Sequence, residues 1–483
     1  MTELNSADGK RTTLSRREFL RIAGIAGASI GVAGGLGGLV AACGGEEETT
    51  TTAGVTTTAG PTTTAGATTT VSAAAEVGRV IKVGLSVPKT GPLSTFMIPF
   101  DWVHEQWTKI LADGVVCGDG KNHPIKTSVF DTQSDTNRTA QVTGDLITNE
   151  KVDIIFAGGA PDTMNPAADQ CEALECPGLM ISGPWQPFYF GRGGTPDNNP
   201  FKWAYALCVG IEAMAQCFVE MWDQIPTNKK VGCNFSNSTD GQAWGDEEMG
   251  GPFFFKLGGY EYTLPTFYQP GSEDYTQQIS EFKRFGAEIA SGAMTSGDFT
   301  NFWKQCLQQG FQPKVCTVGM ALTFAQTCEA IGSSAYGLTT ELAWHADYPY
   351  KSSFTGQTCR ELADAYEADT GKQWVSGSEM YSLMELFVYA LKQIPNVDDK
   401  EALIQAISTA KVDTMYGPVD FTMPVDPTAN TPVTHPVPIA LRMPQSAAQW
   451  RKGKKWPFEQ FMVSSKYLPE AKEVSKVEEM QYS

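Results

Sequence analysis

The chain has few basic residues for its length. Of 483 residues, 36 are Lys or Arg and 54 are Asp or Glu, which gives a formal net charge of −18. A protein that holds nucleic acid or an anionic membrane surface mainly through phosphate charge needs the opposite excess. We therefore expect no nucleic-acid partner.

Motifs for metal binding and catalysis are also missing. The four histidines are scattered without the spacing of a zinc site, and no two cysteines form a Cys-x-x-Cys pair. There is no Walker phosphate-binding loop, and no nucleophile, base or metal-ligating residues stand at a plausible spacing. The sequence thus predicts no metal site, no cofactor and no enzymatic activity.

Long apolar runs are scarce, and the single one lies near the N-terminus at residues 22–40. Arg16 and Arg17 precede it and resemble the twin-arginine export signal. The run ends in Val-Ala-Ala before Cys43, which resembles the lipobox of bacterial lipoproteins, where the cysteine is acylated and the preceding peptide is removed. A transmembrane anchor is the alternative, but the many glycines weaken both the helix and its hydrophobicity.

A threonine-rich segment of low complexity follows and holds no core-forming residues. We expect residues 1–42 to be a signal peptide and residues 43–78 to be a tether that begins at the lipidated Cys43. The protein would then lie outside the cytoplasm, bound to the membrane by its lipid anchor. Ten cysteines remain, and they either pair as disulfides, which export permits, or stay buried as free thiols.

From Arg79 onward, apolar runs alternate with amphipathic stretches. Strands are predicted at 80–87, 125–130, 152–157 and 179–182, with helices at 99–112, 136–150 and 164–174 between them. This alternation predicts a parallel sheet covered by helices on both faces. A second series begins near residue 210, with strands at 230–235, 288–294 and 314–319 and helices at 211–224, 241–257, 273–285 and 299–309.

The fold class predicted is therefore α/β, with two Rossmann-like lobes. We assign residues 79–209 to lobe 1, completed by about 344–415, and residues 210–343 to lobe 2, completed by about 416–483. The late helices predicted at 356–370, 379–393 and 400–410 would return to lobe 1.

Residues 81–85 and 90–93, with a helix after them, resemble the opening of the type I periplasmic binding proteins, and more narrowly the leucine/isoleucine/valine-binding branch that serves ABC importers. Residues 130–132, 152–159 and 416–421 match later landmarks of that family in order. The resemblance covers about residues 79–450. It implies a hinge of three segments near 207–210, 343–345 and 414–416, and a cleft that closes on a solute.

The resemblance also implies where ligand would bind. In amino-acid-binding members, hydroxyl and N–H groups hold the carboxylate, and acidic side chains of the second lobe hold the ammonium. Here Pro161 and Gln186 occupy hydroxyl positions, Glu212 matches one acidic position, and the other falls at Met320 or Ala321. We expect the ligand-binding residues to be Phe96, Asp162, Thr163, Pro184, Trp185, Gln186, Glu212, Trp244, Met294, Thr295 and Met320.

Because half of the expected ammonium site is missing and aromatic residues are added, we expect an amino-acid-like solute: an aromatic or branched carboxylate, or an amide. The predicted function is capture of this small molecule and its delivery to the permease and ATPase subunits of an ABC transporter. The alternatives are an exported enzyme that carries a cofactor and a ligand-sensing subunit of a membrane receptor.

Overall fold

The computed structural model describes residues 75–374, 376–425, 429–440 and 445–482. The predicted signal peptide with Arg16 and Arg17, Cys43 and nearly all of the tether lie outside these residues. No helix within the described part of the chain is long and apolar enough to cross a lipid bilayer.

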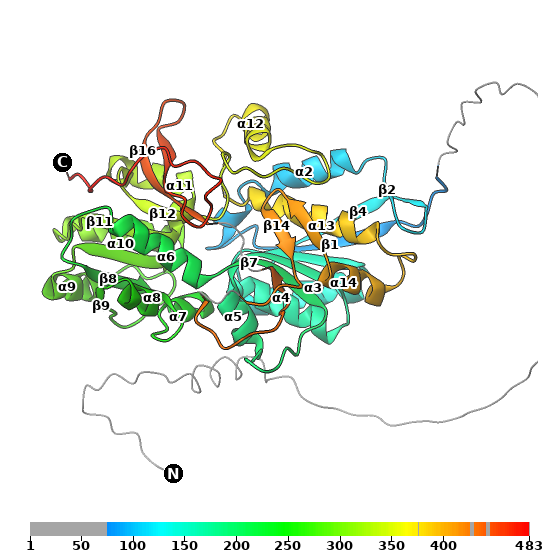
Figure 1. The fold of residues 1–483 in the computed structure, drawn as a ribbon, viewed down its shortest axis with the longest axis horizontal. Coiled ribbons are helices and arrows are strands. Elements are labelled where there is room, and N and C mark those ends of the chain that lie inside the picture. The colour runs from blue at the N-terminus through cyan, green and yellow to red at the C-terminus, as the bar shows by residue number, and fades with distance from the viewer. Residues whose placement is uncertain (1–74, 375, 426–428, 441–444, 483) are drawn as a thin grey trace, which may run out of the picture.

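Two sheets lie side by side, each in its own lobe (Figure 1). The sheet of the first lobe is parallel throughout, and its apolar strands are buried between helices as such strands require. Its strand order is β15 (Ile439–Ala440), β7 (Ala204–Val209), β6 (Gly178–Pro184), β5 (Ile154–Gly158), β1 (Ile81–Val87) and β4 (Ile125–Asp131).

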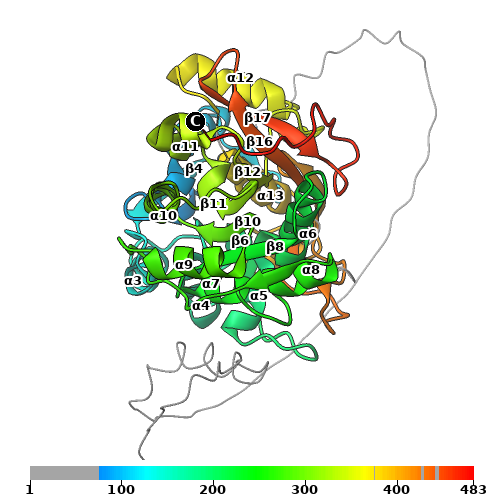
Figure 2. The same cartoon turned by 90° about the vertical axis from the view of Figure 1, so that its left-hand side faces the viewer.

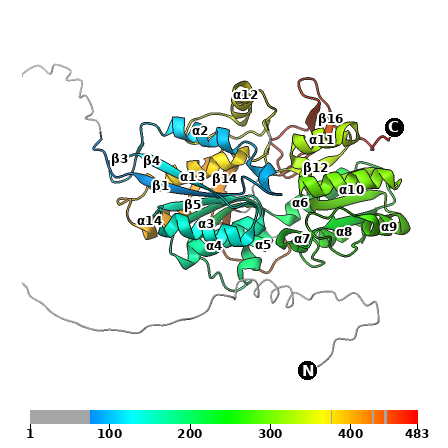
Figure 3. The same cartoon turned by 180° about the vertical axis from the view of Figure 1, so that it is seen from behind.

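Helices cover this sheet on both faces. α3 and α4 pack together on one face, which is best seen from behind (Figure 3), and α2 and α13 pack against each other on the opposite face. The bounds are α2 (Phe100–Ile110), α3 (Thr136–Thr148), α4 (Pro161–Ala173), α5 (Trp185–Tyr189), α12 (Cys359–Thr370), α13 (Tyr381–Leu391) and α14 (Lys400–Ser408). Two small hairpins complete the lobe, β2 (Val115–Val116) with β3 (Asn122–His123) and β13 (Lys411–Thr414) with β14 (Gly417–Asp420).

The second sheet is parallel except at one edge, where β16 and β17 run antiparallel. Its order is β17 (Phe458–Ser464), β16 (Ser446–Lys452), β12 (Thr339–Leu342), β11 (Val315–Met320), β10 (Ile289–Met294), β8 (Lys230–Phe235) and β9 (Glu261–Thr263). Its helices are α6 (Ile211–Trp222), α7 (Thr239–Trp244), α8 (Gly251–Leu257), α9 (Thr276–Phe285), α10 (Ser296–Gln308) and α11 (Ala325–Ile331). The mixed α/β architecture predicted from the sequence is confirmed.

The chain passes between the two sheets after Val209, after Leu342 and between Ala440 and Ser446. The sequence analysis assigned residues from 416 onward to the second lobe, and the structure corrects this, because β15 pairs in parallel with β7 of the first sheet. A strand of two residues carries no signal of which sheet it joins. Residues 446–464 then form the antiparallel edge of the second sheet, and this hairpin rises beside α12 of the first lobe (Figure 2).

The helix predicted at 241–257 is wrong, because the chain forms two helices there, α7 and α8. Gly241 lets α7 approach the end of β8 closely, since a Cβ atom on it would lie 2.1 Å from the carbonyl oxygen of Ser236. The break leaves the short helix α7 at the carboxyl end of the sheet, where it faces the first lobe.

All ten cysteines of the described chain are buried free thiols. Of the two possibilities that the sequence left open, the structure therefore has free thiols rather than disulfides. Burial raises the pKa of Cys117 and Cys176 to about 11, so these thiols stay protonated and unreactive at neutral pH.

Candidate functional site

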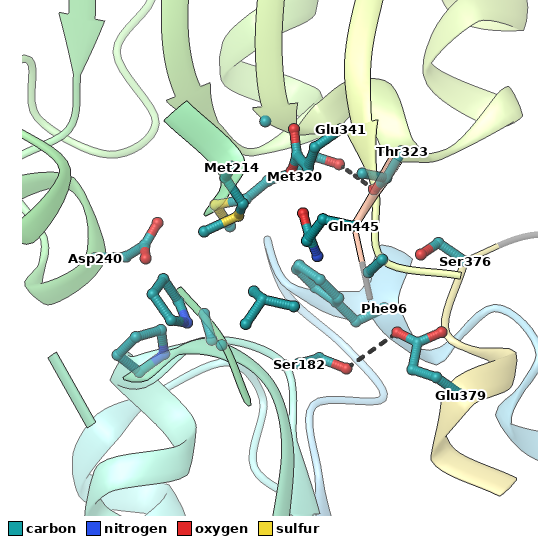
Figure 4. Close-up of a pocket in the computed structure, with 18 of the residues that line it drawn as sticks. Phe96, Ser182, Met214, Asp240, Met320, Thr323, Glu341, Ser376, Glu379 and Gln445 are labelled. Atoms are coloured by element: carbon teal, nitrogen blue, oxygen red, sulfur yellow. Dashed lines mark hydrogen bonds between the residues drawn. The ribbon is translucent and has the colours of Figure 1, made fainter. Parts of the chain in front are cut away.

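A cleft lies between the lobes, at the carboxyl ends of strands from both sheets, where parallel α/β sheets place their ligand sites (Figure 4). Its empty space, counting the part open to solvent, is about 590 Å³. The first lobe contributes Phe96, Gly159, Ala160, Pro161, Ser182, Gly183, Pro184, Val209, Ser376, Glu379 and Tyr416, and the second lobe and the crossings contribute Met214, Asp240, Trp244, Gly319, Met320, Thr323, Glu341, Ala343 and Gln445.

Two residues of the cleft have a backbone that L-amino acids rarely adopt. Ser182 in β6 has φ 73° and Met320 at the end of β11 has φ 61°. A non-glycine residue with positive φ costs of order 1–3 kcal/mol and persists only where surrounding structure enforces it. Such strain concentrates at functional sites, and here it falls at one strand end in each lobe, on opposite walls of the same cleft.

Three carboxyl groups line the cleft. Asp240 comes from α7, Glu341 from β12 and Glu379 from the turn that precedes α13. Figure 4 shows them around the central space, with Asp240 and Glu341 on the second lobe and Glu379 on the first. Among the described lining residues there is no Lys, Arg or His. The described lining is therefore acidic and contributes no basic side chain.

Asp240 is the least satisfied of the three. Its side chain is 4% exposed, and its Oδ1 finds no hydrogen-bond partner among the described residues. Burial raises the pKa of Asp240 to about 8, and the negative charges of Asp162 and Glu341 add to that effect. Without a ligand, this carboxyl group is mostly protonated at neutral pH.

Gln445 is unsatisfied in the same way. It is 1% exposed, and neither its amide nitrogen nor its amide oxygen has a partner in the described part of the chain. Buried polar groups normally are hydrogen-bonded, because leaving one unpaired costs about 1–3 kcal/mol. A buried carboxyl oxygen and a buried amide that both face one cleft therefore indicate a ligand that would complete their hydrogen bonds.

The other two carboxyl groups have partial support from the protein. The hydroxyl of Ser182 donates to Oε1 of Glu379 at 3.3 Å, and the backbone N–H of Gly377 donates to its Oε2. The hydroxyl of Thr340 donates to Oε2 of Glu341 at 3.1 Å. Burial raises the pKa of both glutamates above their ordinary value.

Apolar and aromatic groups form the rest of the cleft. Phe96 of the first lobe packs edge-to-face on Phe324 of the second, with ring centroids 5.2 Å apart. Trp244 is held rigidly, because it stacks on Phe218 and Phe235 at centroid distances of 5.6 and 6.0 Å. These rings offer apolar faces that suit the body of an organic solute.

Four of the eleven residues predicted to bind ligand line this cleft: Phe96, Pro184, Trp244 and Met320. Three others form a separate buried cluster at the start of α6. Trp185 Nε1 donates to the two carboxylate oxygens of Glu212 at 3.1 and 3.2 Å, and Gln186 Nε2 donates to Oε2 at 2.6 Å. Gln186 Oε1 accepts from the N–H of Ile211. These side chains satisfy one another and do not line the cleft.

The remaining predicted residues also lie outside the lining. Asp162 Oδ1 accepts from the backbone N–H of Thr239 at 3.2 Å and so connects the two lobes. The hydroxyl of Thr163 donates to the carbonyl oxygen of Gly158 inside the first lobe. Met294 is buried in the second lobe, and Thr295 is the N-cap of α10, where its hydroxyl accepts from the N–H of Asp298.

Asp240, Glu341, Glu379 and Gln445 also line the cleft and were not among the residues predicted from the sequence. Asp240 precedes the predicted ligand residue Trp244 by four positions, on the same short helix α7. Glu341 lies in a strand of four residues that the periodicity did not indicate. Gln445 follows the third crossing, which was placed elsewhere. Within the described residues, no three His, Cys, Asp or Glu side chains gather closely enough to hold a metal ion.

Two α/β lobes, joined by three crossings and enclosing a cleft at their strand ends, define a protein that binds a small solute between its lobes. The family model for periplasmic binding proteins matches residues 80–440, so the chain belongs to that family. The family resemblance drawn from the sequence is confirmed, and the family and its structural neighbours are binding proteins rather than enzymes.

Solved structures show the same fold at low identity. The leucine-binding protein LivK from Thermotoga maritima has 16% identity and a TM-score of 0.62, covering 79% of this chain and 97% of its own. A solute-binding protein of an ABC transporter from Rhodopseudomonas palustris, in complex with 3,4-dihydroxybenzoic acid, has 19% identity and a TM-score of 0.60, covering 80% and 98%. LivJ from Streptococcus pneumoniae, in complex with isoleucine, has 14% identity and a TM-score of 0.59, covering 80% and 99%.

Proposed function

We propose that this protein is an extracytoplasmic receptor that captures a small organic solute and delivers it to the permease and ATPase subunits of an ABC importer. The observation that carries the proposal is the cleft between the lobes. Both lobes line it, two strained strand ends face it, and it contains the unpaired polar atoms of Asp240 and Gln445. A site of this kind binds a ligand, because the ligand supplies the hydrogen bonds that the protein leaves unmade.

Closure of the lobes would couple binding to delivery. Phe96 meets Phe324 across the cleft, and Asp162 accepts from the N–H of Thr239. Other contacts between the lobes lie outside the cleft, such as those of Glu367 in α12 with Lys455 and Trp456 of the hairpin formed by β16 and β17. A solute that contacts both walls would add the interactions that make closure favourable.

The experiment that tests this function begins with the purified protein without its first 42 residues. Denaturation releases any copurifying solute, which mass spectrometry identifies, and the solute is added back to refolded protein. We expect a smaller radius of gyration by small-angle scattering when the solute is bound. Phe324→Ala serves as a variant with a weakened contact between the lobes, and it should close less completely. If a saturating solute changes neither the radius of gyration nor the tryptophan fluorescence, the proposed function fails.

We further propose that acylated Cys43 holds the protein at the outer face of the membrane, on the support of the twin arginine at positions 16 and 17 and the lipobox-like residues before Cys43. Replacement of Cys43 by Ala should move the protein from the membrane fraction to the soluble fraction. Replacement of the buried Cys117 by Ala is the matched control and should leave the protein at the membrane.

Of the ligand classes expected from the sequence, the lining supports amides better than carboxylates. A carboxylate would be buried beside Asp240, Glu341 and Glu379 with no basic side chain among the described residues of the cleft to pair with it. An uncompensated buried charge is strongly unfavourable. The same reasoning leads to a more specific ligand class.

A further inference from the structure

We propose that the cleft selects an organic solute that carries a protonated amine and no carboxylate. This inference rests on the proposed function, since it names the solute class of the same cleft. It differs from the expectation drawn from family positions, which favoured carboxylates and amides because the second acidic residue of the ammonium site was missing.

The charges of the cleft are the first argument. Asp240 and Glu341 lie on the wall formed by the second lobe, and Glu379 lies on the wall formed by the first. A cation held between the walls would favour the ionised form of these carboxyl groups and would then be attracted by both walls, so its binding would favour closure. An anion would keep these carboxyl groups protonated and gain no ionic partner, because the described lining holds no Lys, Arg or His.

The unpaired hydrogen-bonding atoms are the second and independent argument. Asp240 is 4% exposed with Oδ1 unpaired, and Gln445 is 1% exposed with both amide atoms unpaired. In Figure 4 both side chains are drawn beside the central space. When ionised, the carboxylate of Asp240 only accepts hydrogen bonds, and a protonated amine has up to three N–H donors for it. The amide oxygen of Gln445 can accept a second one, whereas its amide nitrogen is a donor that requires a neutral acceptor elsewhere on the solute.

The apolar lining indicates the chemistry of the rest of the solute. Phe96, Trp244 and Tyr416 contribute aromatic rings, and Met214 and Met320 contribute thioethers. A ring face attracts an organic cation as well as an apolar body. A bare metal ion would instead need several oxygen ligands converging on one point, and no such group of side chains occurs in the described part of the chain. The cleft therefore fits an amine on a hydrocarbon or aromatic body.

Calorimetry on the mature-length protein, stripped of copurified solute, tests the inference with matched pairs of probes. The amines are 2-phenylethylamine and 3-methylbutylamine, the acids of matching shape are 3-phenylpropionate and 4-methylpentanoate, and the zwitterions are phenylalanine and leucine. We expect an amine to bind at least tenfold more tightly than its matched acid and its matched zwitterion.

Asp240→Asn should weaken amine binding at least tenfold, because the amide keeps the shape and removes the charge. Asp246→Asn is the matched control. Asp246 lies just after α7, caps a turn by accepting from the N–H groups of Glu248 and Met249, and does not line the cleft, so its variant should bind the amine as the wild type does. Thermal unfolding of both variants verifies that they are folded.

Each other outcome overturns the inference. Tighter binding of an acid or a zwitterion would refute amine selection while leaving solute binding intact. Arg442, which lies outside the described residues, is the basic residue nearest to Gln445 in the sequence, and loss of acid binding in Arg442→Ala would identify the group responsible. If no probe binds, the inference also fails, whereas the closure experiment with copurified solute judges the proposed function separately.

Discussion

Two carboxyl groups in the second lobe have the same exposure and opposite surroundings. Glu212 on α6 and Asp240 on α7 are each 4% exposed. Glu212 accepts hydrogen bonds from Trp185 and Gln186, and Gly210 leaves room for it, since a Cβ atom there would lie 1.9 Å from Oε1. Asp240 has an oxygen without a partner and faces the cleft.

Glu212 and Asp240 show that a buried acid can have two different roles. The carboxylate of Glu212 is satisfied by its own protein, so it fixes the junction between β7 and α6 at the first crossing. The carboxyl group of Asp240 is left unsatisfied, which costs stability and is useful only if something outside the chain completes it. Burial alone does not distinguish the two, whereas the hydrogen-bond partners do.

Replacement of each acid by its amide should give the largest difference in stability between the two positions. We expect Glu212→Gln to lower the free energy of unfolding by about 2–4 kcal/mol, because the new amide group turns a donor toward the buried N–H groups of Trp185 and Gln186. At pH 7, Asp240→Asn should change stability by less than about 1 kcal/mol, since an amide resembles the protonated acid.

Denaturation by urea at pH 7 measures both values. Equal stability of Glu212→Gln and the wild type would show that the cluster is not a structural element. A large loss in Asp240→Asn would show that this side chain has a partner within the fold.

The fold was largely predictable because its signals are long and regular. β5, an apolar strand of five buried residues, and α10, a helix of thirteen, each carry a clear pattern. β15, with two residues, carries no signal of which sheet it joins, so the third crossing was misplaced. The break between α7 and α8 depends on close backbone packing of glycines, which periodicity does not record.

Cleft residues could be predicted from the sequence only where a place after a strand end also determines that the side chain faces the cleft. Phe96 and Trp244 follow strand ends of their lobes, and both line the cleft. Trp185 and Glu212 also lie at strand ends, yet their side chains turn toward each other, and nothing in the sequence indicates that pairing. The acids that do face the cleft come partly from elements far apart in the chain, such as β12 and the turn before α13.

A second prediction uses pH to isolate Asp240. Its folded pKa of about 8 lies above the ordinary value of 3.8, so the folded state retains a proton that the unfolded state has lost. Stability should therefore fall as the pH rises through the window between these two values, and level off above about pH 8. The negative charges of Asp162 and Glu341 raise the pKa of Asp240 further. Burial raises the pKa of the Tyr268 hydroxyl above its ordinary value, and the negative charge of Asp240 adds to that shift.

The measurement compares unfolding of the wild type and Asp240→Asn at pH 6, 7 and 8. Glu341, Glu379 and Glu385 also have raised pKa values, so both proteins should lose stability with pH. The wild type should lose about 1–2 kcal/mol more than the variant between pH 6 and pH 8. Parallel curves would mean that Asp240 is already ionised and paired with another group.

The smallest expected effect concerns Ser182. Its hydroxyl donates a hydrogen bond to Glu379 at 3.3 Å, so Glu379 is intermediate between the paired Glu212 and the unpaired Asp240. Both Ser182→Ala and Ser182→Gly remove that hydrogen bond, which contributes about 1 kcal/mol. At an ordinary strand position, Gly is less stable than Ala by roughly 0.5–1 kcal/mol. At φ 73° the order should reverse, because Gly relieves a strain of about 1–2 kcal/mol that Ala retains.

We therefore expect Ser182→Gly to be more stable than Ser182→Ala by about 1 kcal/mol and to lie close to the wild type, as measured by urea denaturation. The sign of this stability difference isolates the effect of backbone strain from that of the lost hydrogen bond, because the two variants lose the same hydroxyl and differ only in backbone freedom. If Ala is the more stable replacement, the backbone of β6 is relaxed at this residue. The hydrogen bonds of Glu379 alone would then fix the cleft wall of the first lobe, as those of Glu212 fix the first crossing.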